Sequence, residues 1–161
     1  MLVCMVFHVC LVCMGNICRS PMAEVVLRAK LAEHGLDDRV TVDSAGTGGW
    51  HVGEPMDRRA AATLAAHGYD GSRHRARQFD PAWFEHCDLV LAMDRDNLRQ
   101  LRRIAPPGAD VRLFRSFDPA APPDAEVPDP YYGAEQGFVE VLRLIEAAAD
   151  GLVKHLDTRC R

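Results

Sequence analysis

A short segment near the start of the chain combines residue types suited to phosphate chemistry. It reads Cys13-Met14-Gly15-Asn16-Ile17-Cys18-Arg19-Ser20, with five residues between Cys13 and Arg19. A loop of this length that runs into a helix directs several backbone N–H groups and the positive end of the helix dipole at one point, where an oxyanion binds. Arg19 adds a planar guanidinium that contacts two phosphate oxygens at once.

The same positive field favours the thiolate form of Cys13, which is the nucleophilic form of a cysteine. The segment therefore predicts a sulfur at the floor of an anion site, suited to attack on phosphorus. The Ser20 hydroxyl is close enough in sequence to donate a hydrogen bond to this sulfur.

A second candidate group lies late in the chain, in Asp129-Pro130-Tyr131-Tyr132-Gly133. Cleavage of a phosphate ester needs an acid that protonates the leaving oxygen, and Asp129 is the candidate. Proline restricts the backbone there, and the two tyrosines can form the walls of a pocket for an aromatic ring. The long separation from Cys13 is no objection, because catalytic groups meet in space.

The elements that must position these residues alternate between strand and helix. Apolar runs predict strands at 6–12, 40–42, 89–93 and 111–114. Helices are expected from Ser20, from Asp57, from Asp94 and over Phe138–Leu152. Ser20 is expected to be the N-cap of the first helix, with Pro21 at the first helical position.

This alternation predicts an α/β fold of three layers, with a central four-stranded parallel sheet flanked by helices. Ligands of such folds bind at the carboxyl ends of the strands, and the phosphate-binding loop follows the first strand. We find no internal repeat and no linker, so residues 1–161 are expected to form a single domain.

The sequence resembles the low-molecular-weight protein tyrosine phosphatases of bacterial type. The resemblance rests on 12–21 and 129–133, with typical segments at 43–47, 50–53 and 74–78 between them. It implies hydrolysis of phosphotyrosine in protein substrates, and of small aryl phosphates, through a phosphocysteine. Inorganic phosphate would be the product, and no metal or cofactor would be used.

The resemblance also implies individual roles. Cys13 matches the nucleophile, Arg19 the phosphate clamp and Asp129 the general acid. The rest of the phosphate-binding loop would be Met14, Gly15, Asn16, Ile17, Cys18 and Ser20. A polar network that supports the loop would include Asn16, Ser20, Ser44 and His74, and the rim around the aromatic ring would be Trp50, Tyr131 and Tyr132. Cys18 matches a thiol that forms a reversible disulfide with Cys13 under oxidation.

Other activities on this fold remain alternatives. Arsenate reductases share the loop but need two further cysteines close together later in the chain, where only Cys87 and the near-terminal Cys160 are present. Similar bacterial enzymes with threonine in place of Ile17 favour phosphoarginine, so isoleucine favours phosphotyrosine. A non-catalytic phosphate-binding module could lack the nucleophile or the acid, and both are present here.

Composition also bears on the partners and the location that we expect for the protein. A net charge of −4 and a pI of about 5.9 provide no basic surface for nucleic acid. The apolar start of the chain is too short to span a membrane and lacks the pattern of a signal peptide, so a cytoplasmic location is expected. We also expect a monomer.

The remaining cysteines and the histidines have no predicted role in catalysis. Cys10 and Cys13 form a C-x-x-C pattern, but residues three apart on a strand point to opposite faces. The spacing of the early cysteines does not match a zinc knuckle. The histidines show no recognisable ligand spacing, and Cys4, Cys10, Cys87 and Cys160 remain unassigned.

Overall fold

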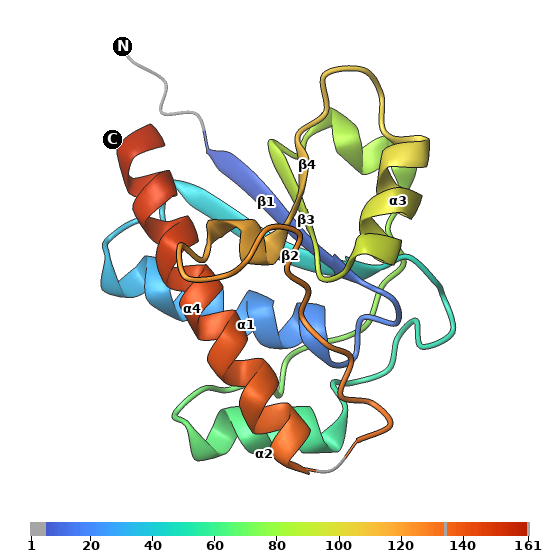
Figure 1. Ribbon diagram of the computed structural model, residues 1–161, viewed down its shortest axis with the longest axis vertical. Coiled ribbons are helices and arrows are strands. Elements are labelled where there is room, and N and C mark those ends of the chain that lie inside the picture. Colours follow the sequence, from blue (N-terminus) through green and yellow to red (C-terminus); the bar gives the residue numbers. More distant parts are fainter. Residues whose placement is uncertain (1–5, 134, 161) are drawn as a thin grey trace.

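A sheet of four parallel strands forms the centre of the molecule, as predicted. The computed structural model describes residues 6–133 and 135–160. The strand order is β2-β1-β3-β4 (Figure 1). Their bounds are Phe7–Cys13 for β1, Val40–Gly46 for β2, Leu89–Ala92 for β3 and Val111–Leu113 for β4. Because all four run in the same direction, their carboxyl ends meet at one edge of the sheet.

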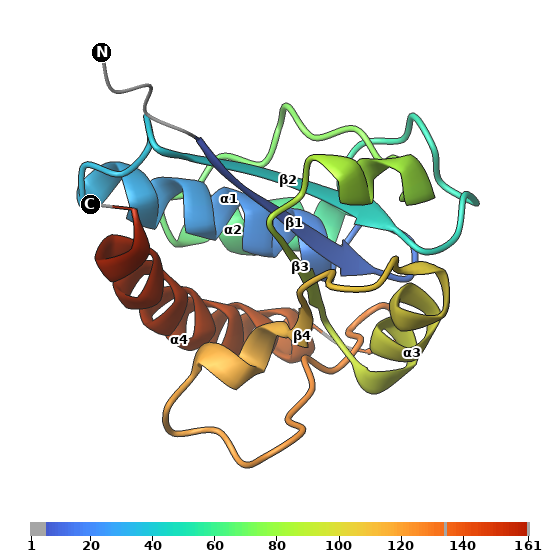
Figure 2. The ribbon, with the colours of Figure 1, turned by 90° about the horizontal axis from the view of Figure 1, so that it is seen from above.

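Helices cover both faces of this sheet (Figure 2). One face carries α1, α2 and α4, which span Arg19–Glu33, Arg58–Ala66 and Glu135–Arg159. The other face carries α3 and the short 3₁₀ helix η1, which span Arg95–Ile104 and Pro81–Glu85. A second 3₁₀ helix, η2, spans Phe114–Phe117 after β4. Neither 3₁₀ helix was expected, because one turn is too short to show a hydrophobic period.

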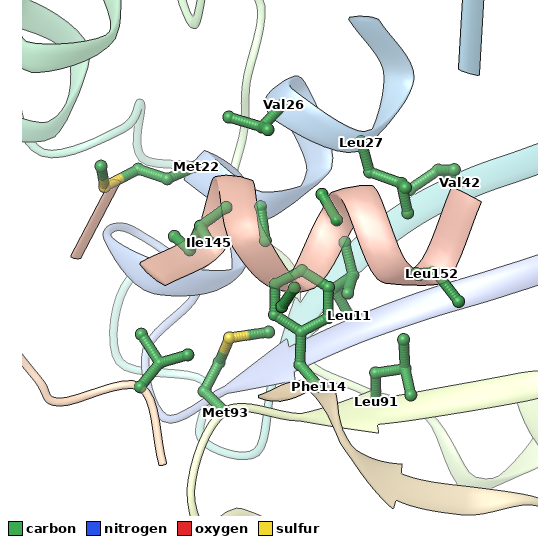
Figure 3. Packing of buried hydrophobic residues seen from close by; sticks show 14 of the residues in the cluster. Leu11, Met22, Val26, Leu27, Val42, Leu91, Met93, Phe114, Ile145 and Leu152 are labelled. Atoms are coloured by element: carbon green, nitrogen blue, oxygen red, sulfur yellow. The ribbon is translucent and has the colours of Figure 1, made fainter. Parts of the chain in front are cut away.

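Successive side chains of each strand point to opposite faces of the sheet, so the core forms two clusters. In β1, Leu11 and Cys13 face the cluster under α1 and α4, whereas Cys10 and Val12 face the cluster under η1 and α3. Figure 3 shows the first cluster, where Phe114 lies between the sheet and the apolar side of α4. The predicted separation of Cys10 from Cys13 on opposite faces of the strand is confirmed.

The start of α1 differs from the prediction. The helix begins at Arg19, and the residue at its N-cap is Cys18, whose side chain accepts no capping hydrogen bond. The expectation that Ser20 caps the helix was wrong, because its hydroxyl contacts the Cys13 sulfur and the Ala45 carbonyl oxygen instead. Asp94 caps α3, as expected, and Asp57 caps α2.

Strand β2 is longer than the predicted 40–42. It continues to Gly46 because it stays paired with β1 as far as Cys13. Its carboxyl end therefore lies beside the start of the candidate phosphate-binding loop.

Cys4 lies outside the described residues. Among the helices of the described residues, none has the length and apolar character required to cross a bilayer.

Candidate active site

The segment after β1 forms one side of a cavity of about 270 Å³ at the carboxyl edge of the sheet. Cys13 is the last residue of β1, and its side chain is only 3% exposed. The turn that follows reverses the chain tightly enough to place the first turn of α1 against this sulfur. As a result, Asn16 N donates to Cys13 Sγ over 3.3 Å, and Ser20 Oγ lies 3.0 Å from the same atom.

Asn16 holds the loop in this conformation. Its φ of 58° lies in the left-handed region, which asparagine tolerates better than most residues. Its buried amide donates to Ser20 Oγ over 2.8 Å and to Ser44 Oγ over 3.0 Å, and its Oδ1 accepts from the backbone N–H of Arg77. Four segments of the chain therefore meet at one side chain.

The network continues outward from the Asn16 backbone and from Ser44. His74 Nε2 lies 2.7 Å from the Asn16 carbonyl oxygen. Burial lowers the pKa of His74, so the neutral ring with a proton on Nε2 donates this hydrogen bond. Ser44 Oγ donates to Glu24 Oε1 over 2.7 Å. The polar network predicted around the loop is thus present, and Glu24 extends it.

Arg19 lies almost wholly buried at the base of the cavity, with 3% of its surface exposed. Its Nη1 donates to Asp94 Oδ2 over 2.7 Å and to the Val127 carbonyl oxygen over 3.1 Å. Burial alone would lower the pKa of Arg19, but the negative charges of Cys13, Asp94 and Asp129 raise it. The guanidinium therefore remains positively charged inside the protein.

Asp129 reaches the same cavity from the long loop before α4. Its Oδ2 lies 3.5 Å from Arg19 Nη2, and its Oδ1 accepts from the backbone N–H of Tyr131. Arg59 of α2 donates to the Tyr131 and Gly133 carbonyl oxygens, so α2 fixes the loop that carries Asp129. Residues more than a hundred positions apart in sequence therefore line one site.

Most of the chain matches known phosphatases. The family model for low molecular weight phosphotyrosine protein phosphatase matches residues 8–161. The chain belongs to this family. A low molecular weight protein-tyrosine-phosphatase of Streptomyces coelicolor is 57% identical over 153 residues, covering 92% of this chain and 93% of that protein.

Solved structures agree with this assignment. A protein tyrosine phosphatase from Entamoeba histolytica superposes with a TM-score of 0.90 at 34% identity, covering 94% of this chain and 97% of that one. A Drosophila arginine phosphatase superposes with a TM-score of 0.84 at 30% identity, covering 92% and 96%. The chain is thus a protein tyrosine phosphatase, a hydrolase of phosphoric monoesters.

Aromatic side chains stand at the mouth of the phosphatase cavity. Trp50 and Tyr132 are 71% and 89% exposed, and Tyr131 lies edge-on to Tyr132 with ring centroids 4.9 Å apart. A Cβ atom at Gly48 would lie 1.8 Å from the Trp50 ring, so this position needs glycine for the ring to lie where it does. All three predicted rim residues therefore line the cavity.

Cys18 also lines the cavity and is 4% exposed. Burial raises the pKa of its thiol strongly, and the negative charges of Asp57, Cys13 and Asp129 raise it further. Cys18 is therefore a neutral thiol at physiological pH. In this respect it is unsuited to be the attacking sulfur of the phosphatase.

The predicted residues fall into two groups. Those that line the cavity are Cys13, Met14, Gly15, Ile17, Cys18, Arg19, Trp50, Asp129, Tyr131 and Tyr132. Those that lie behind the loop and hold it by hydrogen bonds are Asn16, Ser20, Ser44 and His74.

Sequence reasoning missed His51 in the cavity lining, Asp94 as the partner of Arg19, and Arg59 as the support of the Asp129 loop. A signal was available for Asp94, because it directly follows the carboxyl end of a strand, where sites of α/β folds lie. His51 lies in segment 50–53, which resembles the family, but no role was assigned to it. For Arg59, neither residue type nor spacing indicated a role.

Proposed function

We propose that the phosphatase cleaves phosphotyrosine through a covalent phosphocysteine on Cys13. The observation that carries this proposal is that Cys13, Arg19 and Asp129 line one cavity of about 270 Å³. A nucleophile, a cation and a carboxyl group are the three components that transfer of a phosphoryl group from an ester requires.

In the first step, the Cys13 thiolate attacks phosphorus from the floor of the cavity. The bond between phosphorus and the phenolic oxygen breaks as the S–P bond forms. Arg19 and the loop N–H groups bind the equatorial oxygens and stabilise their negative charge. Asp129, as a carboxylic acid, gives its proton to the departing phenolate and becomes a carboxylate.

In the second step, the Asp129 carboxylate takes a proton from a water molecule, whose oxygen attacks phosphorus. The S–P bond breaks, inorganic phosphate leaves, and Cys13 returns to the thiolate. Ser20 Oγ, 3.0 Å from Cys13 Sγ, donates a hydrogen bond that stabilises the sulfur as a leaving group. The two steps together consume one water molecule and return Cys13 and Asp129 to the protonation states in which they began.

The shape of the site supports phosphotyrosine as the substrate. Cys13 lies at the bottom of the cavity, whereas Trp50 and Tyr132 stand exposed at its mouth. A rigid aryl phosphate spans this depth and contacts the rings, but the short side chain of phosphoserine does not. Ile17 adds an apolar wall within the cavity, which suits an aromatic ring better than a guanidinium.

A pair of variants tests the mechanism by hydrolysis of aryl phosphates in EDTA. Cys13→Ser should abolish turnover, whereas Cys160→Ser, a control at a cysteine outside the cavity, should leave it unchanged. Asp129→Ala should slow phenyl phosphate by about 10²- to 10⁴-fold. It should slow p-nitrophenyl phosphate much less, because a good leaving group needs no proton. Equal slowing of both substrates would exclude Asp129 as the acid, and activity in Cys13→Ser would exclude the phosphocysteine.

Substrate choice is tested separately. We expect the native phosphatase to prefer a phosphotyrosine peptide over matched phosphoarginine and phosphoserine peptides. Ile17→Thr should shift the ratio of kcat/KM values towards phosphoarginine. An unchanged ratio would mean that Ile17 does not set the preference, and a native preference for phosphoarginine would make the chain an arginine phosphatase on the same scaffold.

A further inference from the structure

A group of side chains typical of metal sites lies on the sheet face away from α1. His8 belongs to β1, and His86 and Cys87 follow η1 and precede β3. One ring nitrogen from each histidine and the Cys87 sulfur all lie within 4.8 Å of one another. The ligands of a tetrahedral zinc ion are about 3.4–3.8 Å apart, given Zn–N and Zn–S bonds of about 2.1 and 2.3 Å. The limit of 4.8 Å exceeds this spacing by only about 1.0–1.4 Å, and His86 is the exposed member of the group.

This group is separate from the active site. His8 lies five residues before Cys13 on the same strand, which places the two about 16 Å apart. Because the separation is an odd number of residues, their side chains also point to opposite faces of the sheet. None of the three residues lines the active-site cavity.

Asp43 of β2 holds His8 in the way that ligand histidines are usually held. Its Oδ2 lies 2.9 Å from His8 Nε2 and 3.2 Å from Arg77 Nη2. A carboxylate behind a histidine orients the ring and increases its basicity, a common arrangement around protein metal ions. With the Nε2 proton donated to Asp43, Nδ1 is the nitrogen that keeps a lone pair for a metal.

Backbone hydrogen bonds hold His8 of β1 beside the segment that carries His86 and Cys87. Asp88 N donates to the His8 carbonyl oxygen over 2.8 Å, and His8 N donates to Asp88 Oδ2 over 2.8 Å. Cys87 precedes Asp88, so its sulfur is held beside His8. Cys10, buried on the same face of β1, lies against the Cys87 thiol and can supply a second sulfur as the fourth ligand.

We propose that His8, His86 and Cys87 bind a zinc ion at a structural site remote from catalysis. Two imidazoles and a thiolate form a donor set that suits zinc, with the fourth position open to Cys10 or water. The ion would join β1 to the segment that enters β3. The histidine spacing predicted no such site, because 78 residues separate His8 from His86 and only the pairing of the strands brings them together.

Cobalt titration tests the proposal, because Co²⁺ reports a thiolate ligand and tetrahedral geometry by absorption. The background is Cys13→Ser with Cys18→Ser, which removes the active-site thiols that would also bind metal. We expect one equivalent of Co²⁺, a thiolate charge-transfer band, and displacement by Zn²⁺. His86→Ala and Cys87→Ala in this background should each weaken zinc binding by at least about tenfold. His34→Ala, a control at an exposed histidine of another segment, should not.

Two further measurements make the outcome decisive. In the otherwise native phosphatase, His86→Ala and Cys87→Ala should retain full activity, which verifies their folding. Zinc should raise the melting temperature of the Cys13→Ser, Cys18→Ser protein, and His86→Ala should remove this shift. The proposal is overturned if the background protein binds no stoichiometric Co²⁺, if the spectrum lacks a thiolate band, or if the two variants bind zinc as tightly as the background.

Discussion

Replacement of Asp94 by asparagine separates two functions that this carboxylate combines. Its Oδ2 accepts from Arg19 over 2.7 Å, and its Oδ1 accepts from Asn97 N over 2.7 Å to cap α3. Asparagine caps helices about as well as aspartate, so Asp94→Asn preserves the start of α3. With its one oxygen on the Asn97 N–H, the amide turns an NH2 group towards Arg19, so the variant removes both the negative charge and the acceptor that orient the guanidinium.

The expected loss of kcat/KM follows from the burial of the Arg19–Asp94 pair. A hydrogen bond to a charged group contributes about 1.5–3 kcal/mol, and the Arg19 and Asp94 side chains are only 3% and 23% exposed. Loss of this contribution from the transition state lowers kcat/KM by about 10- to 150-fold, at about 1.4 kcal/mol per factor of ten. The Val127 carbonyl oxygen still accepts from Arg19, which favours the lower part of this range.

Steady-state hydrolysis of p-nitrophenyl phosphate measures this effect, with competitive inhibition by inorganic phosphate as a second readout. We expect kcat/KM to fall and the inhibition constant for phosphate to rise, because Arg19 is expected to contact both. Asp96→Asn, an exposed position on the same helix, is the matched control. If Asp94→Asn changes both quantities by less than twofold, Asp94 does not position the clamp and this reasoning fails.

The remaining predictions concern the supports of the site. Arg59→Ala frees the loop that carries Asp129 and should lower kcat for phenyl phosphate by about 10- to 100-fold, since small misplacements of a catalytic group are costly. An unchanged kcat would show that the loop keeps its position without Arg59. Burial lowers the pKa of His74 below its ordinary 6.5, so the unfolded chain binds a proton that the native protein does not. The free energy of unfolding, measured in urea, should therefore fall as the pH drops below about 6.5. His74→Gln should flatten this part of the profile, and an identical slope would contradict the assignment. Peroxide should inactivate the phosphatase by oxidising Cys13 to a sulfenic acid, which condenses with the Cys18 thiol to a disulfide and water. Because the pKa of Cys18 is raised, the activity that dithiothreitol recovers should increase with the pH of oxidation; equal recovery in Cys18→Ser would contradict this.

Matched controls exist for these variants. Arg58→Ala alters an exposed arginine beside Arg59 and should leave kcat unchanged. His67→Gln alters an exposed histidine at the end of α2 and should preserve the pH dependence of stability. Cys160→Ser should leave recovery after peroxide unchanged.

Much of the candidate phosphate-binding loop could be predicted from the sequence, because its geometry depends on residues that are close together in the chain. Cys13 and Arg19 are separated by one short loop between a strand and a helix, so their spacing alone places a sulfur and a cation near the same backbone N–H groups. The alternation of apolar strands with periodic helices likewise predicted the parallel sheet. Chain connectivity then required the loop to lie at its carboxyl edge.

Resemblance to a family, rather than spacing, identified Ser44 and His74. Their positions depend on which strands pair and at what register, and composition does not reveal this. The same holds for the hydroxyl of Ser20. It is a good N-cap residue by type, but the sulfur of Cys13 and the carbonyl oxygen of Ala45 compete successfully for it.

The sequence by itself thus indicated the chemistry proposed for this protein, with a cysteine and an arginine in one short loop and a carboxyl group on a distant loop. Tertiary structure alone decided how these groups are held. Asp94 orients Arg19, and Arg59 anchors the loop of Asp129. The physical reason is the separation of the partners along the chain. Hydrogen bonds within a turn follow from neighbouring residues, whereas contacts between elements exist only after the hydrophobic core has packed those elements together.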